Sequence, residues 1–261
     1  MMPYTRIVEY SSPELNGPVL VQGLPGLGYV GKISVDFLMD HLRTSRFAEL
    51  YSSYLTLEDG SLGINVGNDG GFYLPKYDFY AYTDTIPNLI LLTGNIQPIS
   101  WGQFEVCDQV VSFAERLGCK MVVAIGGYRT PVATERGTVY AVVDGDSIRE
   151  KLQGSSVKIT SGGQVNGACG LVLGLSRQKG MSCLGLLGAT DVTYPDAIAA
   201  KSVVKTLAWL FSLSLNYAEL DRAMAEIESR MEKFGEMREA ALRSDQQPRE
   251  PEERGRAGYY V

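Results

Sequence analysis

Apolar runs alternate with helical patterns along most of the chain. Four runs of mostly apolar residues are typical of short buried strands, and they cover residues 19–22, 88–93, 121–125 and 181–187. Strands that read as continuous apolar segments, without strict alternation, are expected in a sheet that is covered on both faces.

Helical spacing of apolar residues lies between these runs. It is found at residues 32–42, 103–117 and 196–211, while residues 51–82 are rich in Tyr and Gly and predict antiparallel strands and turns. Strands that alternate with helices favour an α/β fold. The expected architecture is three layers: a mixed or parallel sheet with helices on both faces.

A different pattern begins near residue 213. Apolar residues now follow one another at alternating steps of four and three, at Leu213, Tyr217, Leu220, Met224, Ile227, Met231 and Phe234. This is the a/d stripe of a heptad repeat and predicts a long C-terminal helix. Two interpretations stay open: the stripe packs on its own domain, or it serves self-association or contact with a partner.

The last segment is strongly polar. Residues 244–258 contain one apolar residue, Ala257, and cannot offset the entropy of becoming ordered. We therefore expect three parts: an α/β domain at 1–215, a heptad-patterned helix at 216–243, and a disordered tether at 244–261.

The charge balance of the chain limits the classes of partner that it is expected to bind. The chain has 261 residues with 24 Lys and Arg against 30 Asp and Glu, a formal net charge of −6. An acidic balance argues against binding to nucleic acid or to an anionic membrane surface. Since no apolar run approaches the length of a membrane span and no signal peptide is evident, a cytoplasmic protein is expected.

Catalytic and metal chemistry find little support. The single histidine, His41, lies at the expected end of a helix, and the four cysteines are scattered without a Cys-x-x-Cys pair. Asp144 and Asp146 are better explained by a turn, and Asp196 by the cap of the helix that follows it. We expect no catalytic residues, no metal site and no cofactor.

One glycine-rich segment keeps an alternative open. Gly26, Gly28 and Gly31 match the spacing of a dinucleotide fingerprint between a strand and a helix. Such a site also needs an acidic residue that binds the ribose at the end of the next strand. Glu49 is the candidate, but it lies in a segment that does not clearly form a strand. A close-packed structural turn is favoured, and the alternative is an α/β enzyme that binds a nucleotide or small ligand with this loop.

Several ordered blocks carry a resemblance to a known family. The segment 23–31 (GLPGLGYVG) resembles the opening signature of the proteasome assembly chaperone 2 family in its archaeal form. Residues 91–98 and 125–128 resemble its second and third blocks, and residues 165–175 its longest one. The match continues through Leu187 to Asp196.

The resemblance implies a fold, a partner and an assembly. The expected fold is like that of phosphorylases and hydrolases, without a known activity. The expected partners are α-subunits of the proteasome core particle and further copies of this chain, with a tetramer or pentamer as the expected sizes. The function that it implies is an ATP-independent assembly chaperone or core-particle activator.

The resemblance also gives the chain end a role. Such proteins end in a hydrophobic-Tyr-any tripeptide that inserts between neighbouring α-subunits, and the last residues here are Tyr259, Tyr260 and Val261. A buried ring, a hydroxyl with a polar partner and a terminal carboxylate beside a cation suit this docking. These residues are the predicted partner-binding site.

Overall fold

The computed structural model describes residues 4–129, 135–191 and 194–245. Within them, nine strands form one sheet, in the order β1-β3-β6-β7-β2-β8-β11-β9-β10. In chain order, the strands of this sheet are β1 (Thr5–Glu9), β2 (Val19–Gly23), β3 (Ser45–Ser52), β6 (Lys76–Tyr82), β7 (Leu89–Gly94), β8 (Met121–Arg129), β9 (Val139–Asp144), β10 (Lys158–Ile159) and β11 (Ser182–Thr190).

The four predicted apolar runs form the parallel centre of the sheet. They are β7, β2, β8 and β11, each parallel to its neighbour. Two of these strands continue beyond the predicted ends, because β8 and β11 pair through Gly126, Gly127 and Gly188 as far as Arg129 and Thr190. The prediction of a mixed sheet is confirmed.

Antiparallel strands extend this centre on both sides. On one side β6 joins β7, and β3 and β1 follow it; on the other side β9 runs antiparallel to β11. A separate hairpin of β4 (Asn65–Val66) and β5 (Phe72–Tyr73) lies within the segment that predicted turns. Residues 46–51, which did not clearly predict a strand, lie in the eight-residue strand β3.

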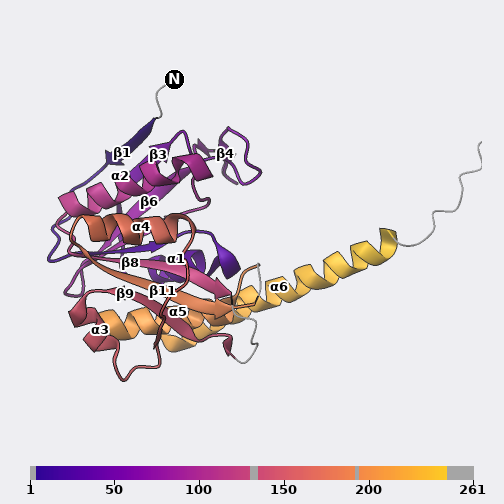
Figure 1. Ribbon diagram of the computed structural model, residues 1–261. Helices are drawn as coiled ribbons and strands as arrows, with labels where there is room; N and C mark the ends of the chain where they lie inside the picture. Colours follow the sequence, from indigo (N-terminus) through magenta and orange to yellow (C-terminus); the bar gives the residue numbers. More distant parts are fainter. Residues whose placement is uncertain (1–3, 130–134, 192–193, 246–261) are drawn as a thin grey trace, which may run out of the picture.

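Helices cover both faces of the sheet (Figure 1). Two apolar cores result: one lies beneath α2 and α4, and the other beneath α1, α3, α5 and the start of α6. The helices are α1 (Val30–His41), α2 (Gln103–Arg116), α3 (Asp146–Leu152), α4 (Gly167–Gln178), α5 (Ala197–Phe211) and α6 (Tyr217–Asp245).

The expected long C-terminal helix is present as α6, with 29 residues. Figure 1 shows it starting against α5 and then leaving the body, so that its second half extends beyond the sheet. Across the described ranges, none of the helices has the length and apolar character needed to cross a membrane.

Candidate functional site

The predicted docking residues Tyr259, Tyr260 and Val261 lie outside the residues that the structure describes. The structure does place the helix that precedes them, which ends at Asp245 and points away from the body (Figure 1). The tail as a partner-binding site therefore stays a prediction. The structural question that can be answered is how α6 is held at its base.

The first half of α6 is packed on its own domain. Leu220 and Met224 are buried in the core beneath α5, and Ile227 packs against the same core. An ion pair between Lys201 of α5 and Asp221 of α6, with Nζ and Oδ1 2.9 Å apart, lies at the same junction. For these positions of the heptad stripe, the interpretation as an intramolecular packing face is confirmed.

The glycine-rich loop between β2 and α1 is a place of close backbone contact. A Cβ added to Gly23 would lie 2.1 Å from the carbonyl oxygen of Gly31, and one added to Gly31 would lie 2.6 Å from that of Ile125. A Cβ on Gly127 of β8 would lie 2.2 Å from the carbonyl oxygen of Leu27. No side chain fits at these positions, so the glycines let the loop lie directly on β8.

The three glycines of the candidate ligand loop lie in different surroundings. Gly26 and Gly31 line a cavity at the carboxyl ends of the parallel strands. Gly28 adopts a left-handed conformation with φ of 62° and lies beside Thr190. Its carbonyl oxygen accepts a hydrogen bond from the backbone N–H of Asp196 at 2.8 Å, so this glycine joins the loop to the start of α5.

Gln97 ties the same loop to α4. Its Nε2 donates to the carbonyl oxygen of Pro25 at 2.6 Å, and its Oε1 accepts from the backbone N–H of Ala168 at 3.1 Å. One side chain thus joins the loop after β2 to the first turn of α4. These contacts bring together three of the blocks that carried the family resemblance.

The cavity bounded by these blocks has a volume of about 480 Å³. Its floor comes from the ends of β2 and β8 with Gln22 and Ile125, and its sides from the glycine-rich loop and the residues that lead into α4. In open α/β sheets, ligands bind outside the carboxyl ends of the strands. Sequence reasoning assigned Gln22 to a strand but gave it no role, although a polar residue at the end of an apolar run was a usable signal.

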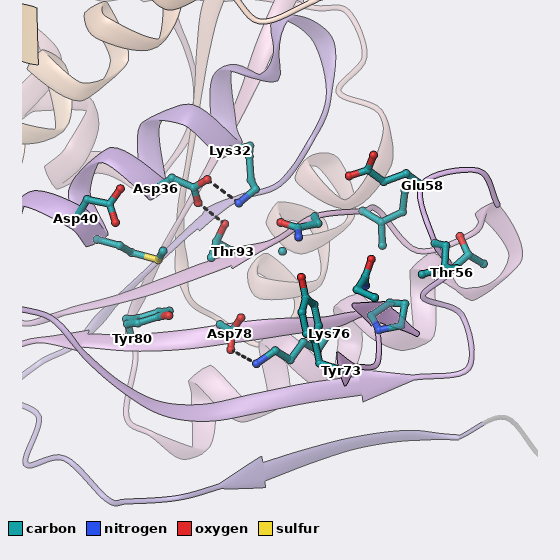
Figure 2. A pocket seen from close by; sticks show the side chains of 17 residues that line it. Lys32, Asp36, Asp40, Thr56, Glu58, Tyr73, Lys76, Asp78, Tyr80 and Thr93 are labelled. Carbon is teal, nitrogen blue, oxygen red and sulfur yellow. Dashed lines mark hydrogen bonds and ion pairs between the residues drawn. The ribbon is translucent and has the colours of Figure 1, made fainter. Parts of the chain in front are cut away.

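A second, smaller cavity of about 250 Å³ lies beside α1, and most of its charges are already paired (Figure 2). Asp36 accepts from Lys32, with Oδ2 and Nζ 2.5 Å apart, and from the Thr93 hydroxyl at 2.9 Å. Lys76 and Asp78 form another pair at 2.9 Å. This internal pairing explains the arrangement as local structure.

Glu49 lies behind that cavity as a buried carboxylate in β3. Burial alone would raise its pKa, but hydrogen bonds from Lys76, Tyr10 and Tyr51 outweigh burial and lower the pKa to about 2. The Tyr51 hydroxyl donates at 2.6 Å. Glu49 is separated from the glycine-rich loop by two strands, β6 and β7, so its surroundings are those of a structural ion pair and not of a ribose-binding acid.

Asp196 caps α5, as its position before an apolar helix predicted. Its Oδ1 accepts from the backbone N–H groups of Ile198 and Ala199, each at 3.1 Å. Arg136 donates to both carboxylate oxygens at 3.1 Å, and Thr190 donates at 2.6 Å. Burial opposes ionisation, yet these donors lower the pKa of Asp196. Sequence reasoning found the cap but missed Arg136, which lies 60 positions away.

The cysteines and the histidine make contacts that are typical of structural residues. Burial raises the pKa of Cys107, Cys119 and Cys169 to about 12, so these thiols are neutral near pH 7. His41 ends α1, where its ring stacks on Phe37 at 3.9 Å. Within the described ranges, no group of three or more His, Cys, Asp or Glu residues is arranged to hold a metal ion.

Solved structures that are similar to this chain include two archaeal proteins. One is PbaB of Pyrococcus furiosus, an archaeal proteasome activator, with 31% identity and a TM-score of 0.78 over 88% of this chain and 98% of that one. Another is PbaA of the same organism, a homologue of proteasome-assembly chaperone, with 22% identity and a TM-score of 0.73 over 92% and 95% of the two chains. At that identity PbaA supports the fold alone.

Sequence comparison gives the family. An uncharacterized protein of Methanocaldococcus jannaschii is 28% identical over 244 residues, which are 93% of this chain and 92% of that protein. The sequence profile of the PAC2 family matches residues 20–234, from β2 into α6. This stretch includes every block from which the resemblance was inferred, and the chain belongs to the PAC2 family.

Proposed function

We propose that this chain is an ATP-independent proteasome-binding protein that docks its C-terminal tail into pockets between proteasome α-subunits. It would act as an assembly chaperone homologue or as an activator of the core particle, and as a binding protein rather than an enzyme. The observation that carries the proposal is the likeness to PbaB, an archaeal proteasome activator, at 31% identity over 88% of this chain.

The position of α6 supports the proposal. Its base is held on α5 by Leu220, Met224 and the Lys201–Asp221 ion pair. Its far end extends from the body (Figure 1). A peptide attached at Asp245 therefore starts away from the α/β domain, where it can reach another protein without displacing a core contact.

The chemistry of the last three residues suits a pocket between subunits. The Tyr259 and Tyr260 rings offer apolar area with a hydroxyl at the tip. The terminal carboxylate of Val261 can pair with a Lys or Arg side chain through charge-assisted hydrogen bonds. Recognition of a free C-terminal carboxylate is an established mode of peptide binding.

The presence of several tails in one oligomer would explain how so short a segment could bind with high overall affinity. If the chain forms a homo-oligomer, a tetramer or pentamer, several tails would face one ring of α-subunits. After the first tail docks, the next binds at a high effective concentration, and individually weak contacts add up. The location proposed with this function is the cytoplasm, where the proteasome core particle works.

The test is a binding experiment with archaeal core particles. Native mass spectrometry or a pull-down should detect a complex with the full chain, and deletion of residues 259–261 should abolish it. Tyr260→Ala should weaken binding at least about tenfold, since loss of a buried aromatic anchor costs about 2 kcal/mol or more and about 1.4 kcal/mol corresponds to a factor of ten. Equal binding by the deletion variant would overturn the tail mechanism.

Controls separate the tail from the body. Gln246→Ala, in the segment between α6 and the tail, should bind like the unmodified chain because it alters neither the docking residues nor the terminal carboxylate. Peptide hydrolysis by mature core particles should rise if the protein is an activator. Faster formation of rings from free α-subunits, without that rise, would assign it to assembly.

A further inference from the structure

The cavity at the carboxyl ends of β2 and β8 contains a buried polar group that the fold leaves without a partner. Gln22 is 1% exposed and lines this cavity. Among the described residues, its side-chain amide has no hydrogen-bond partner. The side-chain atoms that are sealed from solvent without a partner in the described residues belong to Tyr77 and Ser176 and not to Gln22, so the Gln22 amide faces the open space of the cavity.

The charge around the cavity has one sign. Arg129, at the end of β8, lines it, while the lining residues include no Asp or Glu. No ion pair joins Arg129 to any other described residue. Cys169, at the inner wall, adds no negative charge, because burial raises the pKa of its thiol to about 12.

The first turn of α4 adds a further favourable field. Val165, Asn166 and Gly167 lead into this 12-residue helix and line the cavity. The first N–H groups of a helix have no partner within it, and its dipole favours negative charge there. Asn166 makes no side-chain capping bond. One of the amides, that of Ala168, is taken by Gln97, which also holds the loop after β2 in place.

Another cavity differs from this one in the way its charges are paired. The cavity of about 690 Å³ beside α5 is lined by the cations Arg136, Lys158 and Lys205. Two of them are paired with acidic residues, Arg136 with Asp196 and Lys158 with Glu135, and Lys205 lies over the ring of Tyr217. Arg129, by contrast, makes no ion pair with the other described residues. The Gln22 amide and the N-terminus of α4 lie at the same cavity as Arg129.

We propose that the cavity of about 480 Å³ binds a small organic anion, a carboxylate or phosphate whose neutral part carries an amide-like edge. The anionic group would lie near Arg129 and the start of α4, and the neutral part would pair with the Gln22 amide, which both donates and accepts. The volume is within the range of small-ligand pockets. This site is separate from the C-terminal tail and does not depend on the proposed function.

Matched probes test the proposal by isothermal titration calorimetry on the full chain. N-acetylglycine carries a carboxylate and an amide edge, and N-acetylglycinamide is its neutral counterpart. O-phospho-N-acetylethanolamine and N-acetylethanolamine form the corresponding phosphate pair. We expect at least one charged probe to bind with a Kd of about 1 mM or tighter, and its neutral partner to bind at least about tenfold more weakly.

Two variants separate the roles of the residues. Arg129→Gln should weaken the charged probe at least about tenfold while the neutral probe is unchanged; Arg177→Gln, an exposed arginine at the other end of α4, is the control. Gln22→Leu should weaken N-acetylglycine and remove its advantage over acetate. The same variant should not lower the Tm, because no hydrogen bond of the Gln22 amide to the described residues would be lost.

Three results would overturn the proposal. The first is the absence of saturable heat with both charged probes at about ten times the expected Kd. The second is equal affinity for charged and neutral partners. The third is a Gln22→Leu variant that keeps its affinity and melts at a lower temperature, which would make Gln22 a structural residue.

Discussion

At the scale of single residues, buried charges are placed where hydrogen-bond donors surround them. Glu49 and Asp196 are both nearly inaccessible, at 3% and 0% exposure, and each accepts from several donors that lower its pKa. Neither group lies where a ligand could reach it. Gln22 is the contrast: it is as buried as they are, and among the described residues its amide has no partner.

Glu49 gives a prediction with a defined pH window. Glu49→Gln removes the charge that Lys76 faces and should lower the free energy of unfolding by about 3 kcal/mol at pH 7. Because the folded pKa of about 2 lies below the ordinary value of 4.5, the contribution is complete above 4.5 and is lost as the pH falls toward 2. Urea denaturation of both proteins across this range measures the difference.

The pH dependence of the stability difference decides whether this prediction holds. The difference between the two proteins should shrink steadily below pH 4.5, the ordinary value. A difference that stays constant to pH 2 would mean that Glu49 is not held in its ionised form by the fold. Glu150→Gln, at an exposed position of α3, is the matched control and should change stability by less than about 0.5 kcal/mol.

At the scale of elements, α6 has two halves with different surroundings. The heptad stripe predicted one continuous helix, but could not say what the stripe touches, since a periodic apolar face has the same sequence whether it packs on its own domain or on another chain. The structure places Leu220 and Met224 in the core. Farther along, at the middle of α6, Met231 is only half-buried.

This division predicts two separable effects. Leu220→Ala should cost about 3 kcal/mol of unfolding free energy, because it leaves a cavity beneath α5. Met231→Ala should cost less than about 1 kcal/mol in the isolated chain. Denaturant unfolding measures both, and native mass spectrometry of the same samples reports whether Met231→Ala changes the oligomer. Equal costs at the two positions would contradict the division.

Several elements were predictable and several were not. The central strands and α1, α2 and α5 were visible because buried parallel strands and amphipathic helices have distinct periods. Strand β3 was missed because four consecutive residues, 47–50, are buried, which removes the alternation expected of an edge region. Helix α4 was recognised only as a family block, since its glycines obscure its apolar face.

At the scale of the whole molecule, one sheet carries two apolar cores. The core under α2 and α4 and the core under α1 and α5 share strands β2, β7 and β8, whose residues alternate between them. Val21 and Leu91 face one core, while Leu20 and Leu92 face the other. The two faces should therefore lose stability together.

Hydrogen exchange can test this coupling. Leu207→Ala in α5, at 0% exposure, should lower the free energy of unfolding by about 3 kcal/mol. Exchange of the slowest amides in α2, on the opposite face, should accelerate to the same extent. The exposed Leu62→Ala is the control, with an expected change below about 0.5 kcal/mol. Unchanged protection of α2 would mean that the two faces unfold independently.

The sequence alone determined the α/β class, the central strands, the long C-terminal helix and the family, because these depend on local periodicity and on ordered motifs. Only the tertiary structure decided which distant residues meet. Gln97 joins Pro25 to Ala168, Arg136 neutralises Asp196, and the loop glycines lie on β8. Such contacts link residues far apart in the chain, and periodicity carries no information about them. The unpartnered amide of Gln22 became visible for the same reason, since hydrogen-bond satisfaction is a property of the packed molecule.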